Sequence, residues 1–277
     1  MADITGVFAA THTPVMLNFP DAVSASDRDA VYASFKDLGR RVAAARPQAI
    51  VIAADDHLHN FFLNNLPAFC IGAADSYETP IEPWLKAKRR WLTGNAALGA
   101  HLIGEAHAAG FDPALSMELI LDHGMLTPLE LAGVPGYIPV VPLLVNCVQP
   151  PLPTMLRCLQ WGRFLRDALA SFNGVERVCF LGTGGLSHDV GTPRMGMINE
   201  AFDAEFLRLL REGSDDAVVR YATDNVNLAG NGTEEIRTWL MARGVAGPGA
   251  RFDGFFYKPL TTWYTGIALA EWHQVQG

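Results

Sequence analysis

Histidines occur at four places where an apolar segment of the sequence ends and polar residues begin. His12 lies in ATHTP, His57 in ADDHLHN, His123 in LDHGM and His188 in GGLSHDV. Loops that follow strands are where α/β proteins place most of their catalytic and binding residues. Each histidine alone is explained as an ordinary hydrogen-bonded loop residue. Four in equivalent positions favour a metal or proton-transfer site at one edge of a sheet.

The segment AADDHLHNFF leaves open which of its histidines takes part. His57 and His59 are two residues apart, so in an extended chain they would point to the same side. Asp55 and Asp56 precede them, and charged groups at the end of a buried strand are costly without a partner. The other histidines fall on predicted helices and are interpreted as surface or packing residues: His101, His107 and His273.

A metal site built from few histidines also needs a carboxylate, and AGNGTEEIRTWL offers two. The spacing of Ile236, Trp239 and Leu240 predicts the apolar face of a helix. At about 100° per residue, Glu235 lies roughly 90° from the centre of that face and Glu234 nearly opposite it. Glu235 is therefore predicted to be half-buried and Glu234 solvated. Stabilisation of the helix dipole explains an acid in the first turn, but not one that faces inward.

Two histidines and one carboxylate from separate elements would leave open positions on a bound metal. This set is associated with non-haem Fe(II) oxygenases, and His2Glu sets also hold catalytic zinc. The residues alone thus predict a metal enzyme with Fe(II) or Zn. The GTGG turn before His188 lacks the lysine of a P-loop and the spacing of a dinucleotide-binding motif, so neither function is predicted for it.

The elements that would position these residues alternate between short apolar strands and longer helical patterns. Strands are expected over 4–10, 49–54, 67–73, 138–146, 175–185 and 252–259, and helices over 26–47, 94–110, 152–172, 199–213 and 234–244. Ser26 is the predicted N-cap of the first helix. A capping box at TPLE predicts another helix from Thr127, just after His123. Pro142 indicates an edge strand or a bulge.

This alternation predicts an α/β fold, a central mixed β-sheet flanked by helices, in a single domain over residues 1–277. The net charge of −8 and the lack of a basic stripe argue against a nucleic-acid partner. No apolar run approaches the ~20 residues of a membrane span, and the N-terminus shows no signal-peptide pattern, so a cytoplasmic protein is expected. The scattered cysteines are expected to be reduced core residues: Cys70, Cys147, Cys158 and Cys179.

Several stretches, in one order along most of the chain, resemble the type II (class III) extradiol ring-cleaving dioxygenases. They are THTP, DDHLHNFFLNNLPAFCIG, DHGMLTPLE, IPVVPLLVN, GTGGLSH, AGNGTEEIRTW and FYKPLTTWYTG. In that family a histidine directly after an acid closes the strand, and His57 occupies this position. The resemblance implies that His12, His57 and Glu235 bind Fe(II). It also implies that His188 is the acid–base histidine and that His123 is a second active-site histidine.

The resemblance further implies that O2 cleaves the ring of a substituted catechol beside the diol, in aromatic compound catabolism. Thr261, Thr262 and Tyr264 of LTTWYTG are candidates to line the substrate pocket. Some family members need a small helical subunit over the active site, so either such a partner or a homo-oligomer is expected. The alternatives are a zinc-dependent hydrolase and a non-catalytic metal-binding protein on the same scaffold. The presence of both His123 and His188 argues against the non-catalytic protein.

Overall fold

A mixed β-sheet lies at the centre of the computed structural model, which describes residues 1–273. Its eight strands are β1 (Asp3–Ala10), β2 (Ala49–Ala54), β3 (Phe69–Gly72), β6 (Ala114–Ser116), β7 (Val140–Val145), β8 (Arg177–Thr183), β9 (Arg251–Leu260) and β10 (Thr265–His273). Across the sheet they follow the order β6-β3-β7-β2-β8-β1-β10-β9. The strands β1, β8, β2 and β7 run parallel, whereas β10 and β3 flank them antiparallel. The predicted central mixed sheet is confirmed.

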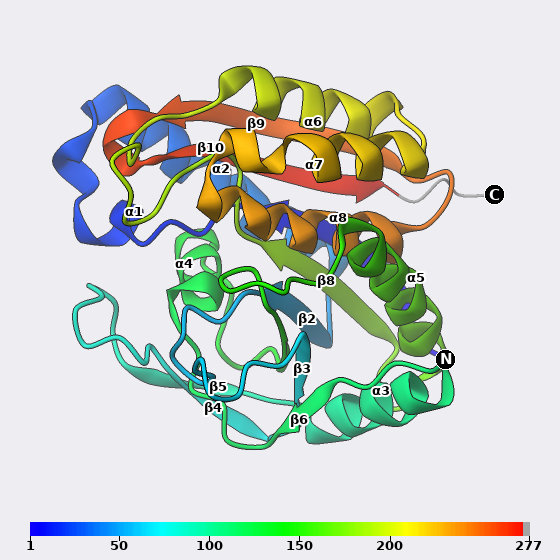
Figure 1. The fold of residues 1–277 in the computed structure, drawn as a ribbon. Helices are drawn as coiled ribbons and strands as arrows, with labels where there is room; N and C mark the ends of the chain where they lie inside the picture. The colour runs from blue at the N-terminus through cyan, green and yellow to red at the C-terminus, as the bar shows by residue number, and fades with distance from the viewer. Residues whose placement is uncertain (274–277) are drawn as a thin grey trace.

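Helices cover both faces of this sheet, as predicted (Figure 1). They are α1 (Val15–Asn18), α2 (Ala25–Ala45), α3 (Ala96–Ala108), α4 (His123–Ala132), α5 (Met155–Ser171), α6 (Glu200–Glu212), α7 (Asp215–Ala229) and α8 (Arg237–Ala246). The 3₁₀ turns are η1 (Pro20–Ala22), η2 (Asn231–Ile236) and η3 (Thr261–Trp263), and β4 (Ser76–Thr79) pairs separately with β5 (Arg90–Thr93). Within residues 1–273, no helix combines the length and apolar character that crossing a membrane requires.

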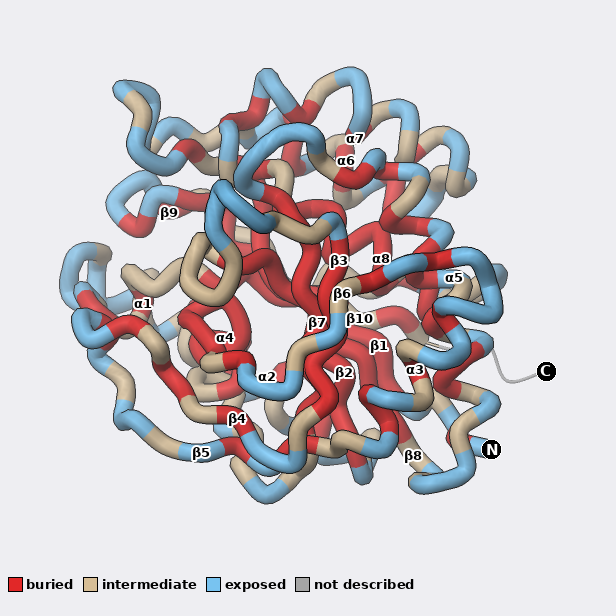
Figure 2. Tube along the Cα trace, turned by 60° about the horizontal axis from the view of Figure 1, so that its bottom comes forward, coloured by how far each residue is buried: buried red, intermediate tan, exposed pale blue. Residues whose placement is uncertain are grey.

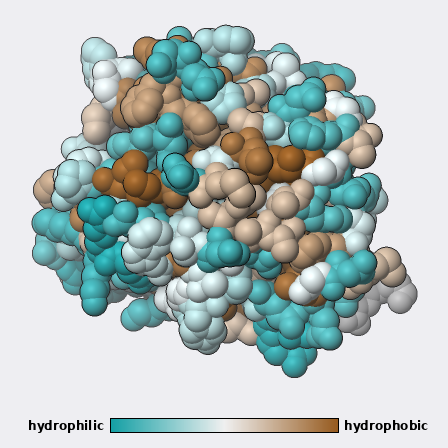
Figure 3. All heavy atoms as spheres, turned by 90° about the horizontal axis from the view of Figure 1, so that it is seen from below, coloured by the Kyte–Doolittle hydropathy of each residue, from teal (hydrophilic) through white to brown (hydrophobic). Residues whose placement is uncertain are grey.

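The strands are covered on both sides, which explains their continuous apolar sequences. All of β2 is buried. Val51 packs in one apolar cluster with residues of α3 and α5–α8, and the next residue, Ile52, in a second cluster with residues of α2 and α4. Successive strand residues point to opposite faces, so both must be apolar. Figure 2 shows the central strands buried, and Figure 3 shows hydrophobic surface residues as separate patches among hydrophilic ones on the face seen from below.

The first long helix begins earlier than predicted. Ser24, rather than Ser26, is its N-cap, and the Ser24 hydroxyl accepts a hydrogen bond from the N–H of Asp27 at 3.1 Å. Both serines are suitable caps, but only Ser24 has the extended backbone that a cap requires before the helix starts at Ala25.

The helix α4 also begins earlier, at His123 instead of Thr127. The Asp122 carboxylate caps it by accepting a hydrogen bond from the N–H of Gly124 at 2.9 Å. Pro128 therefore lies inside the helix, where it has no N–H to donate to the carbonyl of Gly124, four residues before it. His123 is the first residue of a helix and not a loop residue, and the carbonyl of Gly124 is free for another donor.

Pro142 lies in a central strand, which corrects the prediction of an edge strand or a bulge. The strand β7 pairs with β2 on one side, with Ile52 opposite Pro142, and with β3 on the other. The pairing with β3 covers Leu143–Val145 and stops before Pro142. Because β3 does not pair with β7 at Pro142, the N–H that proline lacks is not needed there. Proline at this central position therefore removes little hydrogen bonding from the sheet.

The carboxyl ends of three adjacent parallel strands meet at one edge of the sheet. His12 follows β1, residues 55–57 follow β2, and Gly184 follows β8. The turn η2 brings Glu235 to the same edge from the end of α7. Because parallel strands end together, residues far apart in the sequence become neighbours here.

Candidate active site

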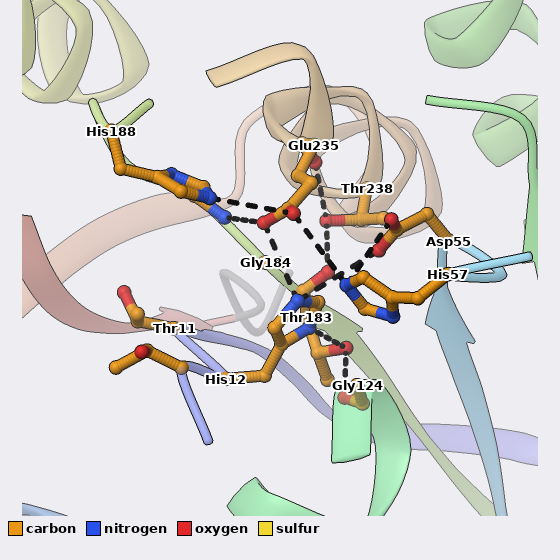
Figure 4. Close-up of polar contacts among 12 residues, drawn as sticks. Thr11, His12, Asp55, His57, Gly124, Thr183, Gly184, His188, Glu235 and Thr238 are labelled. Atoms are coloured by element: carbon orange, nitrogen blue, oxygen red, sulfur yellow. Dashed lines mark hydrogen bonds and ion pairs between the residues drawn. The ribbon is translucent and has the colours of Figure 1, made fainter. Parts of the chain in front are cut away.

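Four side chains at this edge converge on a single point. His12, Asp55, His57 and Glu235 each offer a ligand atom, and these atoms all lie within 4.8 Å of one another. The Nε2 atom of His12 is 3.4 Å from Oε2 of Glu235, and that of His57 is 3.4 Å from Oδ2 of Asp55. Figure 4 shows Glu235 between His188 on one side and His57 with Asp55 on the other. The donor set of imidazoles and carboxylates is suited to a divalent transition metal.

The ring orientation of His12 is fixed by Thr183 at the end of β8. The Thr183 hydroxyl donates to the carbonyl of Gly124 at 2.7 Å, the carbonyl that Pro128 leaves free. Its oxygen can then only accept from the Nδ1–H of His12, at 3.2 Å. This leaves the Nε2 lone pair of His12 directed at the cluster, which is the tautomer that binds a metal.

Asp122 fixes the ring orientation of His57 through Nδ1, as Thr183 does for His12. The Asp122 carboxylate accepts from the backbone N–H of His57 at 3.2 Å and from its Nδ1–H at 2.8 Å. Burial lowers the pKa of His57, but Asp55 and Asp122 outweigh it and raise the pKa well above its ordinary value. A carboxylate behind a histidine fixes the ring and increases its basicity as a ligand. Asp122 therefore has two tasks, as cap of α4 and as partner of His57.

Glu235 is held by the glycine turn that follows β8. The N–H of Gly185 donates to Oε2 of Glu235 at 2.7 Å. Gly184 has a φ of +125°, and a Cβ there would lie 2.7 Å from Cβ of Glu235, so only glycine fits. The GTGG motif therefore holds the Glu235 side chain in place. Glu235 is buried and belongs to η2, whereas Glu234 pairs with Arg237 instead of being solvated.

The charges of this cluster fit a bound cation. Burial raises the pKa of Asp55 to about 6, with Glu235 adding to the shift and His57 opposing it. Burial opposes ionisation of Glu235 too, but His12 and His188 hold its pKa well below the ordinary value. Oδ1 of Asp55 is buried and has no hydrogen-bond partner among residues 1–273. An orphaned buried carboxylate oxygen is costly, and a metal ion between the four side chains would satisfy it.

Replacing Asp55 with asparagine should therefore weaken binding of a divalent metal by about 10–100-fold, the usual effect of removing a group that supports a metal site. The amide keeps the shape and removes the charge. Asp56→Asn is the matched control, because the Asp56 carboxylate accepts from the backbone N–H groups of Asn60 and Phe61 instead. Competition with a chelator measures both affinities. Equal affinity in Asp55→Asn and the unaltered protein would contradict a role for Asp55 at the metal.

His188 lies beside Glu235, with its Nε2 atom directed at the Glu235 carboxylate. Its Nδ1–H donates to the carbonyl of Leu186 at 2.9 Å, and its Nε2 lies 3.6 Å from Oε1 of Glu235. Burial lowers the pKa of His188, but Glu235 outweighs it and raises the pKa. The ring packs on Gly232, where a Cβ would lie 2.1 Å from Nε2. The imidazole is thereby held at the cavity with Nε2 able to take or give a proton.

His123 is buried beside the cluster and depends on an acid that the sequence patterns did not reveal. Oε1 of Glu82 accepts from the Nδ1–H of His123 at 2.6 Å and from its backbone N–H at 3.0 Å. Burial and the neighbouring His57 lower the pKa of His123 to about 4, so it is neutral near pH 7. His59 also contacts Glu82, at 3.3 Å from Nε2 to Oε1. The structure thus places His59 with Glu82, outside the His12–Glu235 cluster.

A cavity of about 260 Å³ opens onto these residues. His12, His57, His123, His188 and Glu235 contribute to its inner wall. Tyr264, one of the three candidates for the substrate pocket, is among the lining residues. Thr261 and Thr262 are exposed on η3 and are not among the lining residues. The cavity therefore gives a small molecule access to the cluster and to both histidines at once.

Comparisons with known proteins identify a family and several similar proteins. A family model described as "Catalytic LigB subunit of aromatic ring-opening dioxygenase" matches residues 6–268. A 2,3-dihydroxyphenylpropionate/2,3-dihydroxicinnamic acid 1,2-dioxygenase of Photorhabdus laumondii is 27% identical, over 95% of this chain and 95% of its own length. The protein of that name from Cupriavidus necator is 30% identical, over 93% and 95%. The crystal structure of an uncharacterized Escherichia coli K12 protein has the same fold, with a TM-score of 0.64 at 16% identity over 96% of this chain and 98% of that one.

Proposed function

The chain belongs to the LigB family of catalytic subunits of aromatic ring-opening dioxygenases, and we propose that it is an Fe(II)-dependent extradiol dioxygenase acting on a substituted catechol. The observation that carries the proposal is the buried cluster of imidazoles and carboxylates, which opens onto a cavity shared with His123 and His188. The relatives from Photorhabdus and Cupriavidus are named as 1,2-dioxygenases of 2,3-dihydroxyphenylpropionate and 2,3-dihydroxicinnamic acid, and these names support the same reaction class.

We assign the metal to His12, His57 and Glu235, with Asp55 as an additional buried carboxylate beside it. Both histidines present Nε2 to the cluster because Thr183 and Asp122 occupy their Nδ1–H groups. Fe(II) bound there would supply a Lewis acid for the two catechol oxygens and electrons for the reaction with O2. The three assigned side chains would leave positions for both reactants.

Of the two remaining histidines, His188 transfers protons and His123 positions the substrate. The Nε2 atom of His188 accepts a proton from a ring hydroxyl and later returns it, which suits an imidazole near neutral pH. His123 is neutral and keeps its Nδ1–H on Glu82, so its other nitrogen can accept a hydrogen bond from substrate. The reaction breaks the ring C–C bond beside the diol and incorporates both atoms of O2, giving a semialdehyde acid.

Anaerobic reconstitution with Fe(II), followed by O2 and a panel of catechols, tests this function. We expect yellow ring-fission products by absorbance, one O2 consumed per catechol, and loss of activity when Fe(II) is oxidised to Fe(III). A protein that retains iron and binds catechols but cleaves none of them would contradict the proposal. Full activity with zinc, without O2 consumption, would support a zinc hydrolase in its place.

We also predict that a second copy of the chain or a small helical subunit covers the cavity. Measurement of the oligomeric state in solution tests this prediction.

A further inference from the structure

The outer part of the active-site cavity is apolar. Beyond the histidines, its wall is formed by side chains from α1, the segment before β5, the segment after His188 and the turn after η3. The large side chains among them are Val15, Trp84, Val190, Met195 and Tyr264. A ring substituent that points away from the cluster would lie against these groups. Burial of apolar atoms there is favourable because it removes them from water.

No lysine or arginine lines the cavity within the part of the chain that the structure describes. Its charged groups apart from the histidines are Glu235 and Asp189, and both are acids. Asp189 accepts from the backbone N–H of Asn231 at 3.3 Å and pairs with Arg194 at 2.9 Å. Arg194 therefore already serves a buried carboxylate and lines a neighbouring depression.

Lys86 follows Trp84 by two residues, but its ammonium group is directed elsewhere. The Nζ atom donates to the carbonyl of Asn18 at 2.7 Å and lies 5.4 Å from the ring centre of Phe19. Lys86 is not among the lining residues. Because Lys86 and Arg194 are both engaged, an anionic substituent against the apolar outer wall would lose its hydration without gaining a lysine or arginine as counter-ion.

We propose that the cavity selects catechols with an uncharged, apolar ring substituent, an alkyl or aryl group, over those with a carboxylate. This inference rests on the proposed function and names its substrate class. A carboxylate on that substituent would lie against apolar walls, and Arg194 is already paired with Asp189. An alkyl group of the same length would be buried favourably by Val15, Val190 and Met195.

A matched pair of substrates tests the selection. 3-Propylcatechol and 2,3-dihydroxyphenylpropionate have nearly the same length and differ at the end of the side chain, a methyl group against a carboxylate. With the Fe(II)-loaded protein, we expect kcat/KM for 3-propylcatechol to be at least about tenfold higher. Calorimetric binding of both compounds without O2 gives the same comparison independently of turnover.

Insertion of one positive charge should reverse the preference. Met195→Arg places a guanidinium on the cavity wall and should shift the ratio of the two kcat/KM values toward the acid by about tenfold or more. Met197→Arg is the matched control, because Met197 is also exposed but lines the neighbouring depression and not the cavity. The control should keep the original ratio, which excludes an effect of net charge alone.

The outcomes separate this inference from the function on which it rests. Preference for the acid, or equal turnover and binding of both compounds in the unaltered protein, would overturn the inference while the dioxygenase function stands. A preference for the acid that Lys86→Ala removes would identify the cation responsible. Cleavage of neither compound would count against the function, and the anaerobic affinities would then decide the inference. Binding of neither would overturn both.

Discussion

Replacing His12, His57 or Glu235 with alanine should abolish iron retention, whereas His59→Ala should keep most of it. The three residues offer ligand atoms from different elements to one buried point, and each removal leaves too few donors to hold the metal. His59 lies close in the sequence but contacts Glu82. Metal content after gel filtration, measured by elemental analysis, distinguishes the variants, and activity should follow the metal.

His59→Ala is the control for this series because it removes an imidazole two residues from His57. A folded His57→Ala protein that keeps its iron, together with a His59→Ala protein that loses it, would show that the wrong histidine is assigned. Circular dichroism of each variant checks the fold. His57→Ala also leaves Asp122 without its imidazole partner, so moderate destabilisation is expected in addition to metal loss.

Strands could be predicted from the sequence where helices cover both of their faces. AIVIAA and IPVVPLLVN are apolar throughout because helices pack on each side, and the structure has strands there. The helix α7 was missed, since its sequence DDAVVRYATDNVNLA contains few large apolar residues. The prediction of a helix at His273 was wrong, because Thr265–His273 form the strand β10. The small residues in TGIALAEWH suit a helix or a strand equally until β1 and β9 pair with it.

Site residues could be predicted from the sequence where the residue type and its spacing point to a site. They could not be predicted where a contact forms only in the folded chain. Histidines after strands and an inward-facing Glu235 can be recognised from spacing. Glu82 cannot, because it lies 41 residues from His123 in a segment without a periodic pattern. Asp122 was visible as an acid beside a histidine, but its partner His57 is 65 residues away. Such pairs form only when the fold brings the ends of the strands next to α4.

His188→Phe should keep the metal and still bind catechol while turnover falls by roughly 10²–10⁴-fold, the usual contribution of a positioned acid–base group. His188 lines the cavity with its Nε2 atom 3.6 Å from Oε1 of Glu235, and its Nδ1–H is held by the carbonyl of Leu186. Phenylalanine has a similar ring to pack on Gly232 and cannot transfer a proton. Iron content, anaerobic catechol affinity and kcat are the three measurements.

His123→Gln is the comparison that separates proton transfer from substrate positioning. Glutamine can still donate to Glu82 from its side chain, whereas phenylalanine would remove that hydrogen bond from the buried carboxylate. We expect His123→Gln to raise KM more than it lowers kcat, and His188→Phe to do the opposite. The pH profile of kcat should also lose one limb in His188→Phe alone, because that limb reports the group that transfers the proton. An iron-free His188→Phe protein, or one with unchanged kcat, would show that His188 is a ligand or a bystander instead of the acid–base group.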